Sequence, residues 1–181
     1  MAAPYLPHTP WSRRIDGAIE AIGRGLSLIW LLLLAVIVLN VVMRYAFNEG
    51  RIELEELQWH LYSIGFLLGL CYAYQADAHI RVDLLHERMQ DRHKAWVELY
   101  GILLFLVPFM LLVLIYSVPF VISAYELGER APSPGGLPWR WLIKAFLPVG
   151  FFLLLLATLS RFLRVWHFLF RDAYGDAHGR Q

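Results

Sequence analysis

Cysteine and charge are both scarce in this chain of 181 residues. The single cysteine, Cys71, excludes an intramolecular disulfide framework and any zinc or iron–sulfur site that needs several cysteines. Charged residues make up 17% of the sequence, against roughly 25% in soluble domains. Because 16 basic residues oppose 15 acidic ones, the net charge of +1 argues against electrostatic binding to nucleic acid.

Short catalytic motifs are also missing. The sequence contains no P-loop, no G-x-S-x-G, no H-E-x-x-H and no glycine-rich dinucleotide fingerprint. Few strongly polar side chains fall deep inside its apolar segments, and so few are unlike the lining of a substrate or proton pathway. We therefore predict a protein that is not an enzyme, holds no cofactor or metal, and serves as an accessory subunit rather than a complete transporter.

Hydrophobic residues, at 59% of the chain, dominate what is present. Four stretches without charge run over residues 25–43, 57–76, 99–125 and 145–160, and about 20 apolar residues suffice to cross a bilayer as a helix. The last stretch reaches that length if Lys144 and Arg161 extend their charged ends toward the headgroups. The prediction is an all-α integral membrane protein in a single membrane domain, with four transmembrane helices near residues 25–45, 57–76, 97–125 and 141–164.

Basic residues are distributed unequally between the two sides of this arrangement. The N-terminal arm, the loop after the second span and the tail together carry 11, whereas the two other loops carry 5, so both termini are predicted to be cytoplasmic. Before the first span, Thr9 and Pro10 resemble a helix N-cap followed by proline at the first position. Residues 10–24 then read as a short amphipathic helix on the membrane surface, or as a simple extension of the first span.

Polar residues gather at the outer ends of the first two spans. Asn40 and Arg44 lie four residues apart, on one face of the first helix, and the acidic segment 49–56 leads into the second. An arginine at membrane depth needs a partner, and either Glu55 or Glu56 is close along the chain. A pair that joins two helices is favoured over a contact with substrate or ion.

Two further patterns belong to the second span and its end. Gly65 and Gly69 form G-x-x-x-G, which permits close helix approach within the chain or to a partner. His79, Arg81 and Asp83 follow at the predicted cytoplasmic border, where they bind a ligand or partner or simply terminate the helix through hydrogen bonds. Three histidines, His79, His86 and His93, recur every seven residues, but they match no established ligand motif, so a metal site is not expected.

The connection between the third and fourth spans is rich in proline and glycine. Residues 129–144 include two adjacent glycines and three prolines, which indicate a shaped, non-helical loop on the outer side. Such a loop suits docking of a partner, although a plain connector has the same composition. The residues singled out here are Pro134, Gly135, Gly136, Pro138, Arg140 and Lys144.

Taken together, these segments resemble a known family. The series Asn40-x-x-x-Arg44-Tyr45, Glu55-Glu56-Leu57-x-Trp59 and His79-Ile80-Arg81-Val82-Asp83 resembles the small, DctQ-type membrane subunit of TRAP (tripartite ATP-independent periplasmic) transporters. The run Ser133-Pro134-Gly135-Gly136-Leu137-Pro138-x-Arg140-x-x-x-Lys144-x-x-x-Pro148 resembles one branch of that family.

The resemblance implies a four-helix protein of the bacterial inner membrane, surrounded by lipid, with both termini in the cytoplasm. Its partners would be a large multi-span membrane subunit, which carries the substrate and sodium sites, and a periplasmic substrate-binding protein. The chain would then act as a scaffold in ion-coupled uptake (symport), commonly of a carboxylate.

The same resemblance implies roles for individual segments. Arg44 with Glu55 or Glu56 would tie the first two spans together. His79, Arg81 and Asp83 would fix the inner end of the second span, and residues 132–140 would face the binding protein.

A second class of protein also fits a small, helical, histidine-bearing chain. A haem- or quinone-binding membrane anchor of a respiratory enzyme needs, for bis-histidine haem, two histidines at one depth on facing helices. His60 and His79 are 19 residues apart on one segment and do not qualify, but His79 and His167 share the cytoplasmic border. A self-contained small exporter is a third interpretation.

Overall fold

The computed structural model describes residues 6–78 and 89–172, and it is helical in both parts. No strand occurs within these residues, so the all-α prediction is confirmed for the described part of the chain. The helical elements are α1 (Pro10–Ala46), α2 (Ile52–Gln75), α4 (Asp91–Gly101), the π-helical turn η1 (Ile102–Leu106), α5 (Val107–Glu126), α6 (Arg140–His167) and a second π-helical turn, η2 (Phe168–Asp172).

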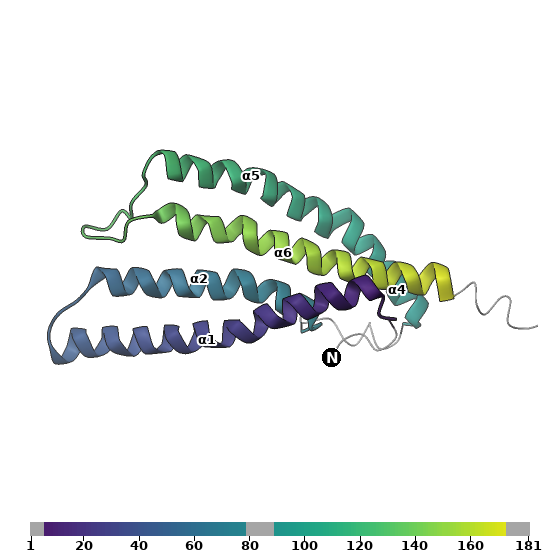
Figure 1. Cartoon of the computed structure of the whole chain (residues 1–181), viewed down its shortest axis with the longest axis horizontal. Helices are drawn as coiled ribbons and strands as arrows, with labels where there is room; N and C mark the ends of the chain where they lie inside the picture. The colour runs from purple at the N-terminus through teal and green to yellow at the C-terminus, as the bar shows by residue number, and fades with distance from the viewer. Residues whose placement is uncertain (1–5, 79–88, 173–181) are drawn as a thin grey trace, which may run out of the picture.

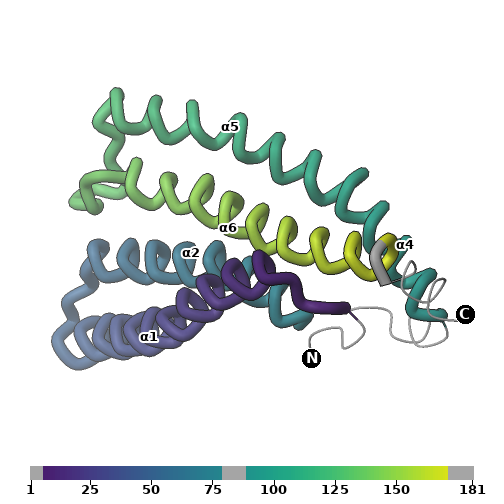
Figure 2. The backbone as a smooth tube through the Cα atoms, turned by 45° about the vertical axis from the view of Figure 1, so that its right-hand side comes forward, coloured from purple at the N-terminus to yellow at the C-terminus, as the bar shows by residue number. Residues whose placement is uncertain are grey.

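The long helices lie side by side in the spatial order α5, α6, α2, α1 (Figure 1). The pairs α5–α6 and α2–α1 are antiparallel, whereas α6 and α2, which occupy the centre of the row, run parallel to each other. The row is a fan: the helices converge where α1 begins and α6 ends, and they diverge toward the 47–51 and 127–139 connections (Figures 1 and 2). We call the converging end the inner end and the diverging end the outer end. Near the inner end, α1 also packs against α6.

Local capping explains where α1 begins. The Ser12 amide donates to Thr9 Oγ1 at 3.2 Å and the Thr9 amide donates to Ser12 Oγ at 3.0 Å, which forms a reciprocal capping box with Pro10 at the first helical position. From there α1 continues without a break to Ala46. Residues 10–24 are thus the first turns of α1 and not a separate helix.

Three helical segments are long and apolar enough to cross a membrane, among the residues that the structure describes. They are Pro10–Ala46, Asp91–Glu126 and Arg140–Phe170. The predicted count of four transmembrane helices is not confirmed, because α2 is not among these segments. Polar side chains, notably Gln58, His60 and Gln75, lower the mean hydropathy of α2 although it has 24 residues.

Glycine governs how closely the central helices approach. A Cβ atom built at Gly150 of α6 would lie 3.0 Å from Leu67 Cβ and 3.1 Å from the Leu67 carbonyl oxygen of α2. Packing through small residues is typical of membrane helices, which have no hydrophobic driving force toward each other in lipid. Much of the remaining apolar surface faces outward, including Leu31, Phe105 and Tyr116. The row therefore presents extensive apolar faces that suit lipid or another membrane protein.

Candidate functional site

An ion pair joins α1 and α2 at the outer end. Arg44 Nη2 donates to Glu55 Oε1, so the structure selects Glu55 rather than Glu56 as the partner that the sequence left open. The two side chains are 47% and 44% exposed. Pairs with this exposure typically stabilise a fold by about 1 kcal/mol or less. The pair is accordingly a weak link within the chain.

Glu56 makes a different contact. Its Oε2 accepts the backbone N–H of Leu137, which is 81 residues further along the chain. A Cβ atom at Gly136 would lie 2.6 Å from Glu56 Oε1, so the absence of a side chain there leaves room for the carboxylate. Glu56 thus connects α2 to the connection between α5 and α6, which we call the outer loop (residues 127–139).

The outer loop is folded by its own glycines and by Glu129. Gly128, with φ of 56°, ends α5, and the Glu129 amide donates to the Ala124 carbonyl at 3.0 Å in the manner of a Schellman motif. The Glu129 carboxylate pairs with Lys144 and lies 3.6 Å from Arg140 Nε. Lys144 also lies 4.0 Å from the centre of the Phe120 ring, so it contacts groups of the protein in addition to any headgroup.

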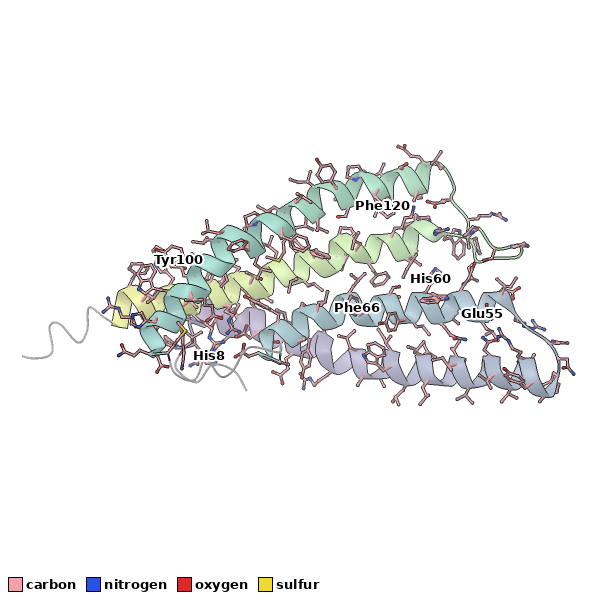
Figure 3. The ribbon with its side chains drawn as sticks, turned by 180° about the vertical axis from the view of Figure 1, so that it is seen from behind. His8, Glu55, His60, Phe66, Tyr100 and Phe120 are labelled. Carbon is pink, nitrogen blue, oxygen red and sulfur yellow. The ribbon has the colours of Figure 1, made fainter. Side chains whose placement is uncertain are left out.

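A cavity of about 340 Å³ opens between α2, the outer loop and the start of α6. Its walls include Trp59, His60 and Ser63 of α2 and Arg140 of α6. His60 Nδ1 lies 2.6 Å from the Glu56 carbonyl oxygen, one helical turn away, and Figure 3 places His60 and Glu55 at this end of α2. The cavity has mixed polar and apolar walls and opens at the outer end.

A second depression, of about 390 Å³, lies on the α1–α2 face beside the Arg44–Glu55 pair. It brings together Asn40, Arg44, Tyr45 and Trp59 from the two predicted motifs, with Tyr45 and Trp59 mostly exposed. Asn40 is buried, and its Oδ1 has no hydrogen-bond partner within the described part of the chain. Tyr45 and Trp59 lie at the outer end, where a membrane interface is expected, and tyrosine and tryptophan favour such interfaces.

The inner end holds a buried ionic cluster. Arg161 of α6 pairs with Asp77, directly after α2, at 2.7 Å, and with Glu98 of α4. These side chains are 8%, 10% and 15% exposed, which makes the cluster far less accessible than the outer pair. Asp77 has φ of 57°, and the Ala78 amide donates to the Ala73 carbonyl at 3.0 Å, so the turn that ends α2 aims this carboxylate at Arg161.

Two hydrogen bonds add α1 to the inner end. Ser160 donates to Asp16 Oδ1 at 2.6 Å, and Gln75 Nε2 donates to the Asp16 carbonyl oxygen at 3.1 Å. The inner cluster, formed by Asp16, Gln75, Asp77, Glu98, Ser160 and Arg161, therefore links α1, α2, α4 and α6.

A family model described as "Tripartite ATP-independent periplasmic transporters, DctQ component" matches residues 33–168 of this chain. The chain belongs to this family. A search of curated proteins finds no match. The matched residues include the outer pair, the outer loop and Arg161, but they begin after the first turns of α1.

Membership in the DctQ family has direct consequences. The chain is a component of a tripartite transporter and not an enzyme, and its partners are a large membrane subunit and a binding protein. Together with the helices that can span a membrane, the family indicates a multi-pass protein of the inner membrane. The alternative of a haem- or quinone-binding respiratory anchor is not supported.

The predicted residues of this DctQ protein differ in the contacts that they make in the structure. Gly65 packs against Trp30, since a Cβ atom there would lie 3.1 Å from the indole, whereas nothing lies within 4 Å of a Cβ atom at Gly69. Within the described residues, Gly65 is thus the glycine of the motif that contacts another helix. His79, Arg81 and Asp83 lie outside the described residues.

Sequence reasoning missed the inner cluster. Arg161 was expected to extend toward lipid headgroups, but its side chain is buried between two carboxylates. The signal that was present is an arginine inside an apolar run of α6, together with acidic residues at the ends of two other helices. An arginine inside an apolar segment usually faces a partner within the protein.

Proposed function

We propose that this DctQ subunit is a scaffold: it braces the large transport subunit and helps to dock the periplasmic binding protein during ion-coupled uptake of an organic acid. The observation that carries the proposal is the location of the polar contacts. Within the described residues the ion pairs lie at the ends of the row of helices, while the long faces between them are apolar. That arrangement suits bracing and docking better than the passage of a polar solute.

We also propose that α2 is a fourth transmembrane helix, despite its lower hydropathy. The support is topological: α1 and the continuous segment formed by α4, η1 and α5 both begin at the inner end and run toward the outer end (Figure 1). If both cross the membrane, α2 has to return the chain across it. Because α2 lies between α1 and α6, its polar residues Gln58 and His60 have protein neighbours in addition to lipid. Both termini then lie on the inner side, where the basic residues are more numerous.

The test of the scaffold proposal is purification of the tagged chain from native membranes in mild detergent, with mass identification of the proteins that accompany it. We expect a large multi-span membrane subunit in fixed ratio with this chain, and the binding protein when substrate is present. Flavin or iron–sulfur subunits in its place would contradict the proposal. Transport by this chain alone in liposomes would contradict it as well.

Substitution of Arg140, the first residue of α6 after the outer loop, tests the docking role of this region. Arg140 lines the outer cavity and is partly exposed beside Glu129. We expect Arg140→Ala to lower the affinity of the complex for the binding protein roughly fivefold or more, as for arginines at the centre of an interface, without loss of assembly. Surface plasmon resonance with the reconstituted complex measures this effect. Arg24→Ala, an exposed residue nearer the inner end, is the control; equal affinities for both variants would contradict the role.

A further inference from the structure

Glu56 differs from Glu55 and Glu129, two other acidic residues at the outer end. Glu55 pairs with Arg44 and Glu129 with Lys144, so each of these carboxylates is matched to a basic side chain. Glu56 Oε2 instead accepts a backbone N–H from the middle of the outer loop, at Leu137. Its contact is therefore with the backbone of the outer loop.

The backbone of the outer loop is unusual. Gly128, Gly135 and Trp139 have φ values of 56°, 82° and 66°, all in the left-handed region. Within the loop, the Gly136 amide donates to the Ser133 carbonyl at 2.9 Å, and the Ala131 amide reaches the Leu137 carbonyl at 3.4 Å. A hydrogen bond to a charged acceptor is stronger than these neutral ones. Glu56 thus provides the strong link that holds residues 131–137 over the N-terminal half of α2.

We propose that Glu56 is a positioning residue for docking: it holds the outer loop in the shape that the periplasmic binding protein recognises. The inference rests on the docking role proposed above and adds the residue that sets its geometry. The outer cavity exists because the loop is held at this place, since Glu56 itself and loop residues Ala131, Pro132, Ser133 and Leu137 form part of its wall. Loss of the link would release the loop and alter the surface that the partner meets.

Gly136 allows the same link to be broken from the opposite side. A Cβ atom there would lie 2.6 Å from Glu56 Oε1 and 2.7 Å from Ala131 Cβ. Its φ is not in the left-handed region, so alanine is compatible with the local backbone and the obstacle is the contact with its neighbours. Gly136→Ala therefore forces the Glu56 carboxylate or the loop to move, which breaks the link without removing any charge.

The experiment measures binding of the substrate-loaded binding protein to the reconstituted complex of both membrane subunits. We expect Glu56→Ala and Gly136→Ala each to weaken binding roughly tenfold, the equivalent of one charge-assisted hydrogen bond. Glu56→Gln is expected to bind like the unmodified complex, because its amide oxygen still accepts the Leu137 N–H. Glu53→Ala removes an exposed carboxylate one turn earlier on α2 and is the matched control.

A second measurement reports the loop directly. Cys71 is fully buried, so spin labels attach selectively to cysteines introduced at Arg51 and Ser133. Distances between these labels are expected to form a narrow distribution in the unmodified protein and in Glu56→Gln. The distribution is expected to broaden in Glu56→Ala and Gly136→Ala.

The outcomes separate this inference from the docking proposal. If the unmodified complex binds the partner and both alanine variants bind it equally well, Glu56 has no positioning role although docking stands. If the unmodified complex does not bind the partner, docking itself fails and the role of Glu56 fails with it. If Glu56→Ala does not assemble, Gly136→Ala decides, because it leaves the carboxylate in place.

Discussion

Arg161→Met is expected to destabilise the protein so strongly that little folded protein is left in the membrane. The substitution leaves Asp77 and Glu98 in a buried site without the guanidinium that holds both of them. Breaking a buried ionic cluster by removing one partner typically costs about 3–5 kcal/mol, which is a large part of the stability of an ordinary domain. Thermal unfolding in detergent, followed by fluorescence-detected size-exclusion chromatography, measures the loss.

A compensated variant distinguishes lost charge balance from lost packing. In Arg161→Met combined with Asp77→Asn and Glu98→Gln, the buried negative charges are removed with the positive one. Apolar or neutral replacements of whole buried clusters are often tolerated, so much of the stability is expected to return. Arg24→Met, at an exposed position of α1, is expected to have no effect. A melting temperature unchanged by Arg161→Met alone would contradict the bracing role of the inner cluster.

Gly150→Leu is expected to produce the second large loss, by forcing the two central helices apart. The position already faces the backbone of Leu67, so a branched side chain has no space to enter. Overpacking of this kind typically costs about 1–3 kcal/mol, and more where backbone has to move. Gly150→Ala is expected to cost less, because a single Cβ atom at 3.0 Å from Leu67 Cβ needs a shift of only a few tenths of an ångström. Thermal unfolding of the two variants in detergent gives the ranking.

Val149→Leu is the matched control for this series. Val149 precedes Gly150 on α6 and is about half exposed, at 47%, so the added carbon can extend into lipid or open surface. We expect it to unfold at the temperature of the unmodified protein. Equal stability of Gly150→Leu and Val149→Leu would show that the α2–α6 contact does not limit how these helices pack.

Several features of this protein were readable from its sequence because they depend on neighbours along the chain. The start of α1 at Thr9 and Pro10 follows from a capping box of four residues. The helical and apolar character of α1, α5 and α6 follows from the length of each uncharged run. Family membership was also predictable, since the ordered motifs from Asn40 to Pro148 lie within the matched residues 33–168.

Tertiary structure decided which polar residues meet. Glu55 and Glu56 are adjacent in sequence, but they point to different partners because successive helical residues are rotated by about 100°. In the same way Gly65 of the G-x-x-x-G pair contacts Trp30 of α1, whereas Gly69 has no such neighbour in the part of the chain that the structure describes. Burial of Arg161 required the ends of α2 and α4 to arrive beside it, from 84 and 63 residues away. Such pairings depend on the rotation and position of whole helices relative to one another, which no short stretch of sequence specifies.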